Sequence, residues 1–164
     1  CIRHVERLPV PLQALEEPVA ARDRQAQRDI AHRLGIRVIL DESLIGPGDL
    51  SAYGEMAHLV IANIRISKNG GILRSIDIGR RAMALGMPVS IGAHVGESSI
   101  LSRAALAVAT ALGPDLMAQE GCFGKLLLKR EAVSPSLRFG YGGRFRTGRY
   151  PDLAGPGSGL HPLT

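Results

Sequence analysis

Cysteine, tryptophan and long apolar runs are scarce or absent in this chain of 164 residues. Its two cysteines, Cys1 and Cys122, are too few for a disulfide framework and lack the spacing of a metal site. No apolar run approaches the roughly 18 residues of a membrane span, and the longest apolar stretch, residues 105–113, is typical of a buried helix. The first residues also lack the design of a signal peptide, so we expect a cytoplasmic protein without a membrane-spanning segment.

The composition is that of a globular domain, with 45% hydrophobic and 21% charged residues. The net charge of +5 raises the question of nucleic-acid binding, and most of the excess lies in a Gly/Pro/Arg-rich segment, residues 134–164. This segment mixes arginine with glycine and aromatic residues, as single-strand binders do, but it is short and contains no repeats. We therefore interpret it as a solvated terminal segment and do not expect a nucleic-acid partner.

Short apolar strands alternate with helices through most of the chain. Strands are predicted at residues 12–18, where Pro18 ends the strand, and at the apolar runs 36–40, 59–66 and 88–92. Helices are predicted at residues 22–35, 49–57, 72–86 and 98–113, with Asp49 as the N-cap of the second one and glycine near the end of the others. This alternation indicates an α/β fold in which outer helices cover a parallel sheet.

A charged residue ends each of the first three predicted strands. These residues are Glu16, Asp41 and Arg65, at spacings of 25 and 24 residues. In a (β/α) barrel the C-terminal ends of the strands meet at one rim, where active sites are built. Two carboxylates there would repel each other, and a hard divalent cation such as Mg²⁺ would remove that repulsion. The alternative is structural, because strand-end acids also cap the helices that follow and a strand-end arginine can cover apolar surface.

Four linked motifs resemble the C-terminal barrel portion of the enolase superfamily, in its mandelate racemase / muconate lactonizing enzyme branch. In order, they are "LEEPV", "LDES", "NIRISKNGG" and "GAHVGESSILSRAALAVATAL", and the similarity runs from about residue 12 to residue 130. The resemblance implies that residues 1–133 form the C-terminal half of a (β/α) TIM-type barrel, followed by the segment 134–164. It also implies that the first half of the barrel and an N-terminal capping domain belong to the protein but lie outside this chain.

The resemblance further implies a chemistry and a set of site residues. Enzymes of this branch bind a substrate carboxylate on Mg²⁺, remove the proton α to it and stabilise the resulting enediolate on the metal. By resemblance, Glu16 and Asp41 are metal ligands, and Glu42 supports Asp41 from outside the ligand sphere. Arg65 stands where the lactonizing-enzyme group usually carries a lysine that acts as acid or base. Glu97 falls at the position of a glutamate that often helps to polarise or protonate the substrate.

Arg65 departs from the family pattern, because a guanidinium, whose pKa lies far above neutrality, does not release its proton near pH 7. We therefore expect Arg65 to be a fixed positive charge that stabilises the developing enolate. The general base is left open among the superfamily's "KxK" lysines outside this chain, Lys68, and His94 at the end of the strand predicted at 88–92. A solvated role in a loop is the alternative for Lys68, and a structural or solvent-facing role is the alternative for His94.

The predicted protein is thus a portion of a Mg²⁺-dependent enzyme that abstracts the proton α to the carboxylate of a small substrate. The reaction would lead to cycloisomerisation, racemisation or dehydration. A truncated, non-catalytic remnant or assembly module that keeps the fold is the alternative. We expect this segment alone to be inactive, and we expect the protein to be a homo-oligomer. Half of a barrel would also leave two open strand edges, which favour aggregation.

Overall fold

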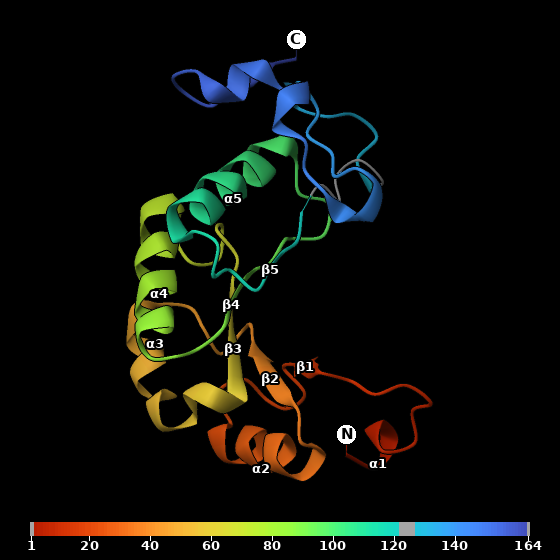
Figure 1. Ribbon diagram of the computed structural model, residues 1–164, viewed down its shortest axis with the longest axis vertical. Coiled ribbons are helices and arrows are strands. Elements are labelled where there is room, and N and C mark those ends of the chain that lie inside the picture. The colour runs from red at the N-terminus through yellow and green to blue at the C-terminus, as the bar shows by residue number, and fades with distance from the viewer. Residues whose placement is uncertain (1, 122–126, 164) are drawn as a thin grey trace.

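The computed structural model describes residues 2–121 and 127–163, and its main feature is a curled sheet of five parallel strands (Figure 1). The strands lie in chain order: β1 Ala14–Glu16, β2 Arg37–Leu40, β3 Val60–Ile64, β4 Val89–Ile91 and β5 Ala118–Gln119. Each strand pairs with the next in parallel. Four of these strands fall within the predicted runs, whereas the two-residue β5 is too short to be predicted from its apolar pattern.

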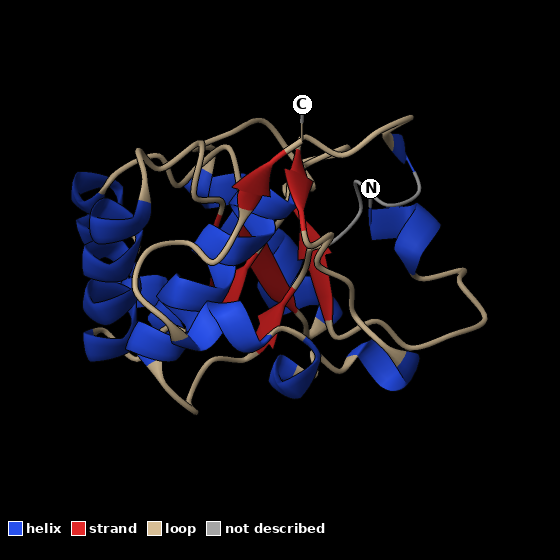
Figure 2. Cartoon of the chain, turned by 90° about the horizontal axis from the view of Figure 1, so that it is seen from above, coloured by secondary structure: helices blue, strands red, loops and turns tan. Residues whose placement is uncertain are grey.

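Helices connect the strands and lie on the outside of the curl (Figure 2). They are α2 Arg24–Leu34, α3 Pro47–Ser51, the 3₁₀ helix η1 Gly54–Leu59, α4 Ile72–Ala84 and α5 Ser99–Leu112, and the short helix α1 Ile2–Val5 precedes β1. The α4 and α5 helices pack against each other along the left of the sheet in Figure 1. Among the described residues, no helix is long and apolar enough to cross a membrane.

The core lies between the sheet and these helices. Alternate residues of a strand point to opposite faces, and in β2 the side chains of Val38 and Leu40 are fully buried in the core. Ile39, between them, and Ser90 of β4 point to the opposite, inner face and are only half-buried. The inner face, which a closed barrel would bury, is therefore partly open to solvent.

The prediction of one helix at 49–57 with Asp49 as its N-cap is wrong. The helix α3 begins at Pro47, whose fixed φ suits the first turn, and the chain then continues as the separate η1. Asp49 is the third helical residue, and its carboxylate accepts hydrogen bonds from the backbone N–H groups of Ile45 (3.0 Å) and Gly46 (2.9 Å). The Asp49 carboxylate still accepts hydrogen bonds from backbone N–H groups at the start of the helix, but Asp49 itself lies inside the first turn.

The C-terminal segment is largely exposed, as expected, and part of it is also held against α5. Its short elements are β6 Val133–Ser134, η2 Tyr141–Gly143, η3 Thr147–Arg149, η4 Pro151–Ala154 and β7 His161–Pro162. The antiparallel pair β6–β7 brings its ends together, and the ring of Phe145 stacks on Tyr150 at 5.2 Å. Arg103 of α5 donates to the carbonyls of Ser158 (2.9 Å) and Leu153 (3.3 Å). The boundary predicted at 133/134 falls inside β6 and stays a prediction.

Candidate functional site

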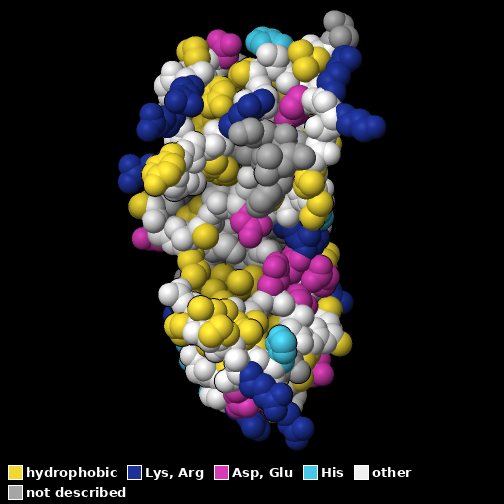
Figure 3. All heavy atoms as spheres, turned by 90° about the vertical axis from the view of Figure 1, so that its right-hand side faces the viewer, with side chains coloured by type: hydrophobic (Ala, Val, Ile, Leu, Met, Phe, Trp, Pro, Cys, Tyr) yellow, Lys and Arg dark blue, Asp and Glu magenta, His cyan; other side chains and the backbone are white. Residues whose placement is uncertain are grey.

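The C-terminal ends of β1, β2 and β3 bring three predicted site residues to one edge of the sheet. Glu16 is the last residue of β1, while Asp41 and Arg65 directly follow β2 and β3. The register pairs Glu16 with Ile39 and Leu40 with Ala62, so these strand ends lie side by side. Figure 3 shows Asp and Glu side chains gathered beside Lys and Arg side chains near the middle of one face.

Asp41 is the centre of this site, and two cations hold its carboxylate. Its side chain is only 4% exposed. Oδ1 accepts hydrogen bonds from Nε of Arg65 and Nζ of Lys68, both at 2.6 Å, and Oδ2 forms an ion pair with Nη2 of Arg65. Glu42 contacts Arg65 Nη2 at 3.1 Å, with 60% of its side chain exposed. We refer to Asp41, Glu42, Arg65 and Lys68 as the Asp41 cluster.

Lys68 is not solvated, which corrects the alternative that placed it in an open loop. Its Nζ donates to the backbone carbonyl of Asp41 (2.6 Å) as well as to Oδ1, and it lies 3.5 Å from the carbonyl of Asn63. The loop folds back because the side chain of Asn69 accepts from Arg65 N (2.9 Å) and donates to the carbonyl of Leu44 (2.9 Å). Burial, followed by the neighbouring Arg65 charge, lowers the pKa of Lys68 to about 8.

Glu16 is oriented by Asn63, a residue that the sequence patterns did not single out. The Nδ2 of Asn63 donates to Oε1 of Glu16 at 3.0 Å, and its Oδ1 accepts from Ser90 Oγ at 3.3 Å. A Cβ on Gly92 would lie 2.5 Å from Asn63 Oδ1, so glycine is needed there. The feature of the sequence that could have identified Asn63 is its polar side chain inside the otherwise apolar run "LVIANI".

A hydrogen-bond relay of buried and half-buried residues also reaches Asp41, and the sequence patterns did not indicate it. Glu17 accepts from Asp41 N (3.2 Å) through Oε1 and from Ser43 Oγ (3.0 Å) through Oε2. Ser43 Oγ in turn accepts from Gln27 Nε2 (3.1 Å), whose Oε1 accepts from the hydroxyl of Tyr53 (3.0 Å). Burial raises the pKa of Glu17 and that of Tyr53. This relay, from Tyr53 to Glu17, fixes the backbone that carries Asp41.

Glu97 and His94 lie in a second group, after β4. Glu97 is 8% exposed, and its carboxylate accepts from His94 N (3.2 Å) and Ser102 Oγ (3.1 Å). Burial raises the pKa of Glu97, and the nearby Glu120 carboxylate acts in the same direction. His94 itself is half-buried. The structure therefore places the predicted residues in two groups, one after β1–β3 and one after β4.

The Asp41 cluster does not fit a Mg²⁺ site in this arrangement. Both oxygens of Asp41 already contact cationic groups, and Oε1 of Glu16 accepts from Asn63. Within residues 2–121 and 127–163, no three His, Cys, Asp or Glu side chains group as metal ligands would. A Mg²⁺ ion requires oxygen ligands that are free to face it.

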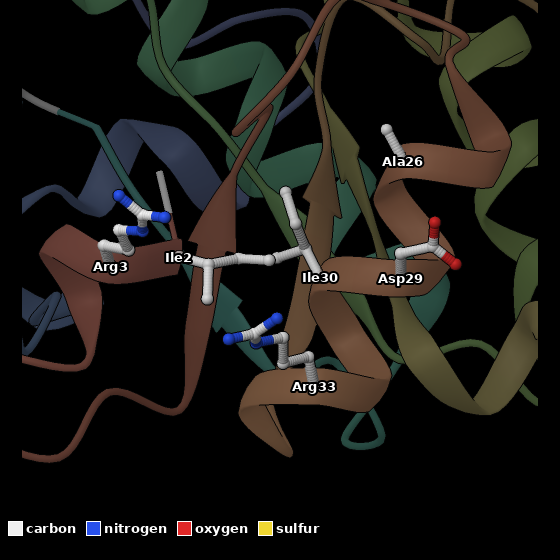
Figure 4. A pocket seen from close by; sticks show the side chains of 6 residues that line it. All are labelled: Ile2, Arg3, Ala26, Asp29, Ile30 and Arg33. Atoms are coloured by element: carbon white, nitrogen blue, oxygen red, sulfur yellow. The ribbon is translucent and has the colours of Figure 1, made fainter.

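A hollow of about 580 Å³ lies elsewhere, between α1 and α2 (Figure 4). The side chain of Ile2 extends toward Ile30 across it, with Arg3 and Arg33 on its rim. None of the predicted site residues lines this hollow. The predicted site residues therefore lie at the strand ends and not in this hollow.

The curled parallel sheet, its outer helices and the charged residues at the strand ends define part of a (β/α)-barrel protein. The model of the family described as "Enolase C-terminal domain-like" matches residues 1–163. The chain belongs to this family, which confirms the resemblance and the half-barrel fold.

One curated protein and two solved structures illustrate the similarity, the structures in fold alone. An L-Ala-D/L-Glu epimerase of Francisella tularensis subsp. novicida is 28% identical over 109 residues, which are 66% of this chain and 31% of that protein. The structure of a mandelate racemase/muconate lactonizing enzyme from Roseiflexus sp. is similar, with a TM-score of 0.79 and 22% identity over 94% of this chain and 41% of that one. A dipeptide epimerase from Cytophaga hutchinsonii, complexed with Mg and D-Ala-L-Val, gives a TM-score of 0.73 and 24% identity over 87% and 37%. The chain thus spans roughly a third to two fifths of the length of these relatives.

Proposed function

We propose that this chain is part of an enzyme that removes the proton α to the carboxylate of a small substrate. The family and the epimerase relatives support this class of reaction. Within it, we propose a reaction that removes the proton with one base, such as cycloisomerisation or dehydration, in preference to two-base racemisation or epimerisation.

The observation that carries this proposal is the position of the Arg65 guanidinium group. Its side chain is 18% exposed and bound to Asp41, so the guanidinium lies at the strand-end site and not in solvent. A guanidinium keeps its proton near pH 7, so Arg65 can stabilise a carboxylate or enolate but cannot exchange a proton during turnover. Arg65 therefore acts as a fixed charge where a second base would otherwise stand.

We propose that Lys68 anchors Asp41 and is not the base. An ammonium has three donors, and three acceptors lie around Nζ: Oδ1 and the carbonyl of Asp41, and the carbonyl of Asn63. This arrangement points no donor toward a substrate. The base would then be His94 or, in our preferred account, a group of the protein outside this chain.

Mg²⁺ dependence is part of the proposal for the whole protein. The dipeptide epimerase of known structure carries Mg. In this chain Glu16 and Asp41 are the predicted ligands, and they would have to release their present partners before they could hold the ion. When bound, the ion would supply positive charge for the substrate carboxylate. Glu97, held near the same sheet edge with a raised pKa, is proposed as a group that donates a proton to the substrate.

A non-catalytic remnant is the second candidate, and the neutralised Asp41 carboxylate favours it. The two candidates are separated by incubating the full-length protein in heavy water with Mg²⁺ and a panel of small carboxylates that includes muconate and D-Ala-L-Val. Loss of an α-proton signal by NMR, or formation of a cyclised or dehydrated product, would support the enzyme. No exchange and no product with any member, from protein that is folded by circular dichroism, would support the remnant.

A further inference from the structure

The start of α5 is capped by Glu131, which lies outside the helix. Ser98 is the N-cap residue, and its side chain makes no capping hydrogen bond. Instead, both carboxylate oxygens of Glu131 accept from the backbone N–H of Ser99, at 3.2 and 3.3 Å, and Oε1 also accepts from Ser99 Oγ at 2.8 Å. A carboxylate placed there satisfies an N–H group that has no partner within the helix. Ser99 is 2% exposed, so this contact is shielded from water.

The hydroxyl of Ser99 also holds the part of the C-terminal segment that leads toward Glu97. Ser99 Oγ accepts from the backbone N–H of Leu137 (2.9 Å), and Leu137 is 1% exposed. Phe139 and Glu97 both lie close to Gly121, because a Cβ there would be 3.3 Å from Cε2 of the ring and 3.5 Å from Oε1 of the carboxylate. The C-terminal segment, held through Ser99, thus reaches the surroundings of the Glu97 carboxylate.

The placement of Glu97 depends on the position of α5. Its carboxylate joins two elements, because it accepts from Ser102 Oγ on α5 (3.1 Å) and from the backbone N–H of His94 in the loop after β4 (3.2 Å). A shift of the first turn of α5 would separate these two donors and admit water to a residue that is now 8% exposed. We infer that Glu131 is a positioning residue for Glu97: by holding the start of α5, it keeps the carboxylate between its two donors.

This inference rests on the proposed role of Glu97 as a proton donor, but its test needs no substrate. The titration of Glu97 is followed by NMR in full-length protein that carries ¹³C at the glutamate carboxyl groups, and Glu97→Gln identifies the signal. In Glu131→Ala the midpoint of this titration should shift down toward 4.5, because burial is the largest cause of the raised pKa and water would now reach the carboxylate. His94 and Glu120, the charged groups that act on Glu97, are unchanged in this variant.

Two control variants separate positioning from other effects. Glu131→Gln removes the charge but keeps an oxygen that can accept from Ser99, so the midpoint should stay near that of the wild type. Arg103→Met releases another part of the C-terminal segment from α5, at the carbonyls of Leu153 and Ser158, and should also leave the midpoint unchanged.

An unchanged midpoint in folded Glu131→Ala would overturn the inference, and so would an equal shift in either control. If Glu131→Ala does not fold, Glu131→Asp decides, because it keeps the charge, withdraws the carboxylate by one methylene group and should shift the midpoint in the same direction. An unchanged midpoint in Glu131→Asp would then overturn the inference. Absence of α-proton exchange would count against the proposed function only, since the titration does not depend on turnover.

Discussion

Glu97 is the most informative titratable side chain outside the Asp41 cluster. Its carboxylate is buried, accepts from one backbone N–H and one hydroxyl, and lies near the Glu120 carboxylate. Burial outweighs these hydrogen bonds and raises its pKa above the ordinary value of 4.5. The Glu97 carboxyl group therefore keeps its proton to a higher pH in the folded protein than in the unfolded chain.

The predicted consequence is a pH-dependent change in stability that Glu97→Gln removes. Between pH 4.5 and the raised pKa the folded state binds more protons, so the contribution of Glu97 to stability is fully present below pH 4.5 and is lost as the pH rises through the folded pKa. Relative to wild type, the free energy of unfolding of Glu97→Gln should therefore increase as the pH rises from 4.5 toward neutrality. Urea melts of the full-length protein measure this difference.

The control for this measurement is Glu55→Gln, because the Glu55 side chain is 94% exposed. Its difference from wild type should stay nearly constant with pH. A Glu97→Gln difference that is flat, or that slopes in the opposite direction, would contradict the raised pKa of Glu97.

Loops that follow neighbouring strands are joined by the relay through Ser43. Ser43 is fully buried, and its hydroxyl accepts from Arg22 N (2.7 Å) and Gln27 Nε2 while it donates to Glu17. The relay thereby connects the loop after β1, the helix α2 and the loop that carries Asp41. The role of the relay is structural, because it holds the Glu17 carboxylate against the backbone N–H of Asp41.

Ser43→Ala should therefore destabilise the protein by about 1–3 kcal/mol, because the buried amide of Gln27 and the half-buried carboxylate of Glu17 lose their partner. Thermal or urea unfolding of the full-length protein measures this change. Ser51→Ala is the matched control, since Ser51 is exposed on α3 and bonds only the nearby Gly48 carbonyl among the contacts described; it should cost less than about 0.5 kcal/mol. Equal effects of the two substitutions would show that the relay adds no stability.

Elements were easier to predict than the contacts between them. The four longer strands lie in apolar runs, and α2, α4 and α5 carry periodic apolar patterns. Gly35 ends α2 as predicted, and it adopts the left-handed conformation. The strand-end positions of Glu16, Asp41 and Arg65 also follow from those patterns. The roles of Asn63 and Glu17 could not be predicted, because their partners lie 47 and 24–26 residues away and the contact depends on three-dimensional register.

At the largest scale, this chain forms a curled sheet that is part of a barrel and does not close on itself. The β1 and β5 strands are three and two residues long, each pairs with a single neighbour in the main sheet, and the inner face is partly exposed. Exposed strand edges and an uncovered face favour association with other chains.

Residues 1–164 expressed alone should therefore form oligomers or a loosely packed state. Size-exclusion chromatography with light scattering and thermal unfolding measure this property, with the full-length protein as the comparison. A clean monomer that unfolds in one sharp transition would contradict the expectation that this part of the barrel depends on its missing partner strands.

The central proposal concerns the reaction of the full-length protein: we propose that Arg65 is a fixed cation and that only one face of the substrate is therefore deprotonated. Arg65→Ala should lower turnover by roughly 100-fold or more, as loss of a preorganised electrostatic contact does. The most direct measurement is α-proton exchange in heavy water, once a turnover substrate is known, with each enantiomer supplied separately. We predict that the unaltered protein labels one enantiomer only. Equal labelling of both enantiomers would contradict the account, because it would require a second proton-exchanging group where Arg65 stands.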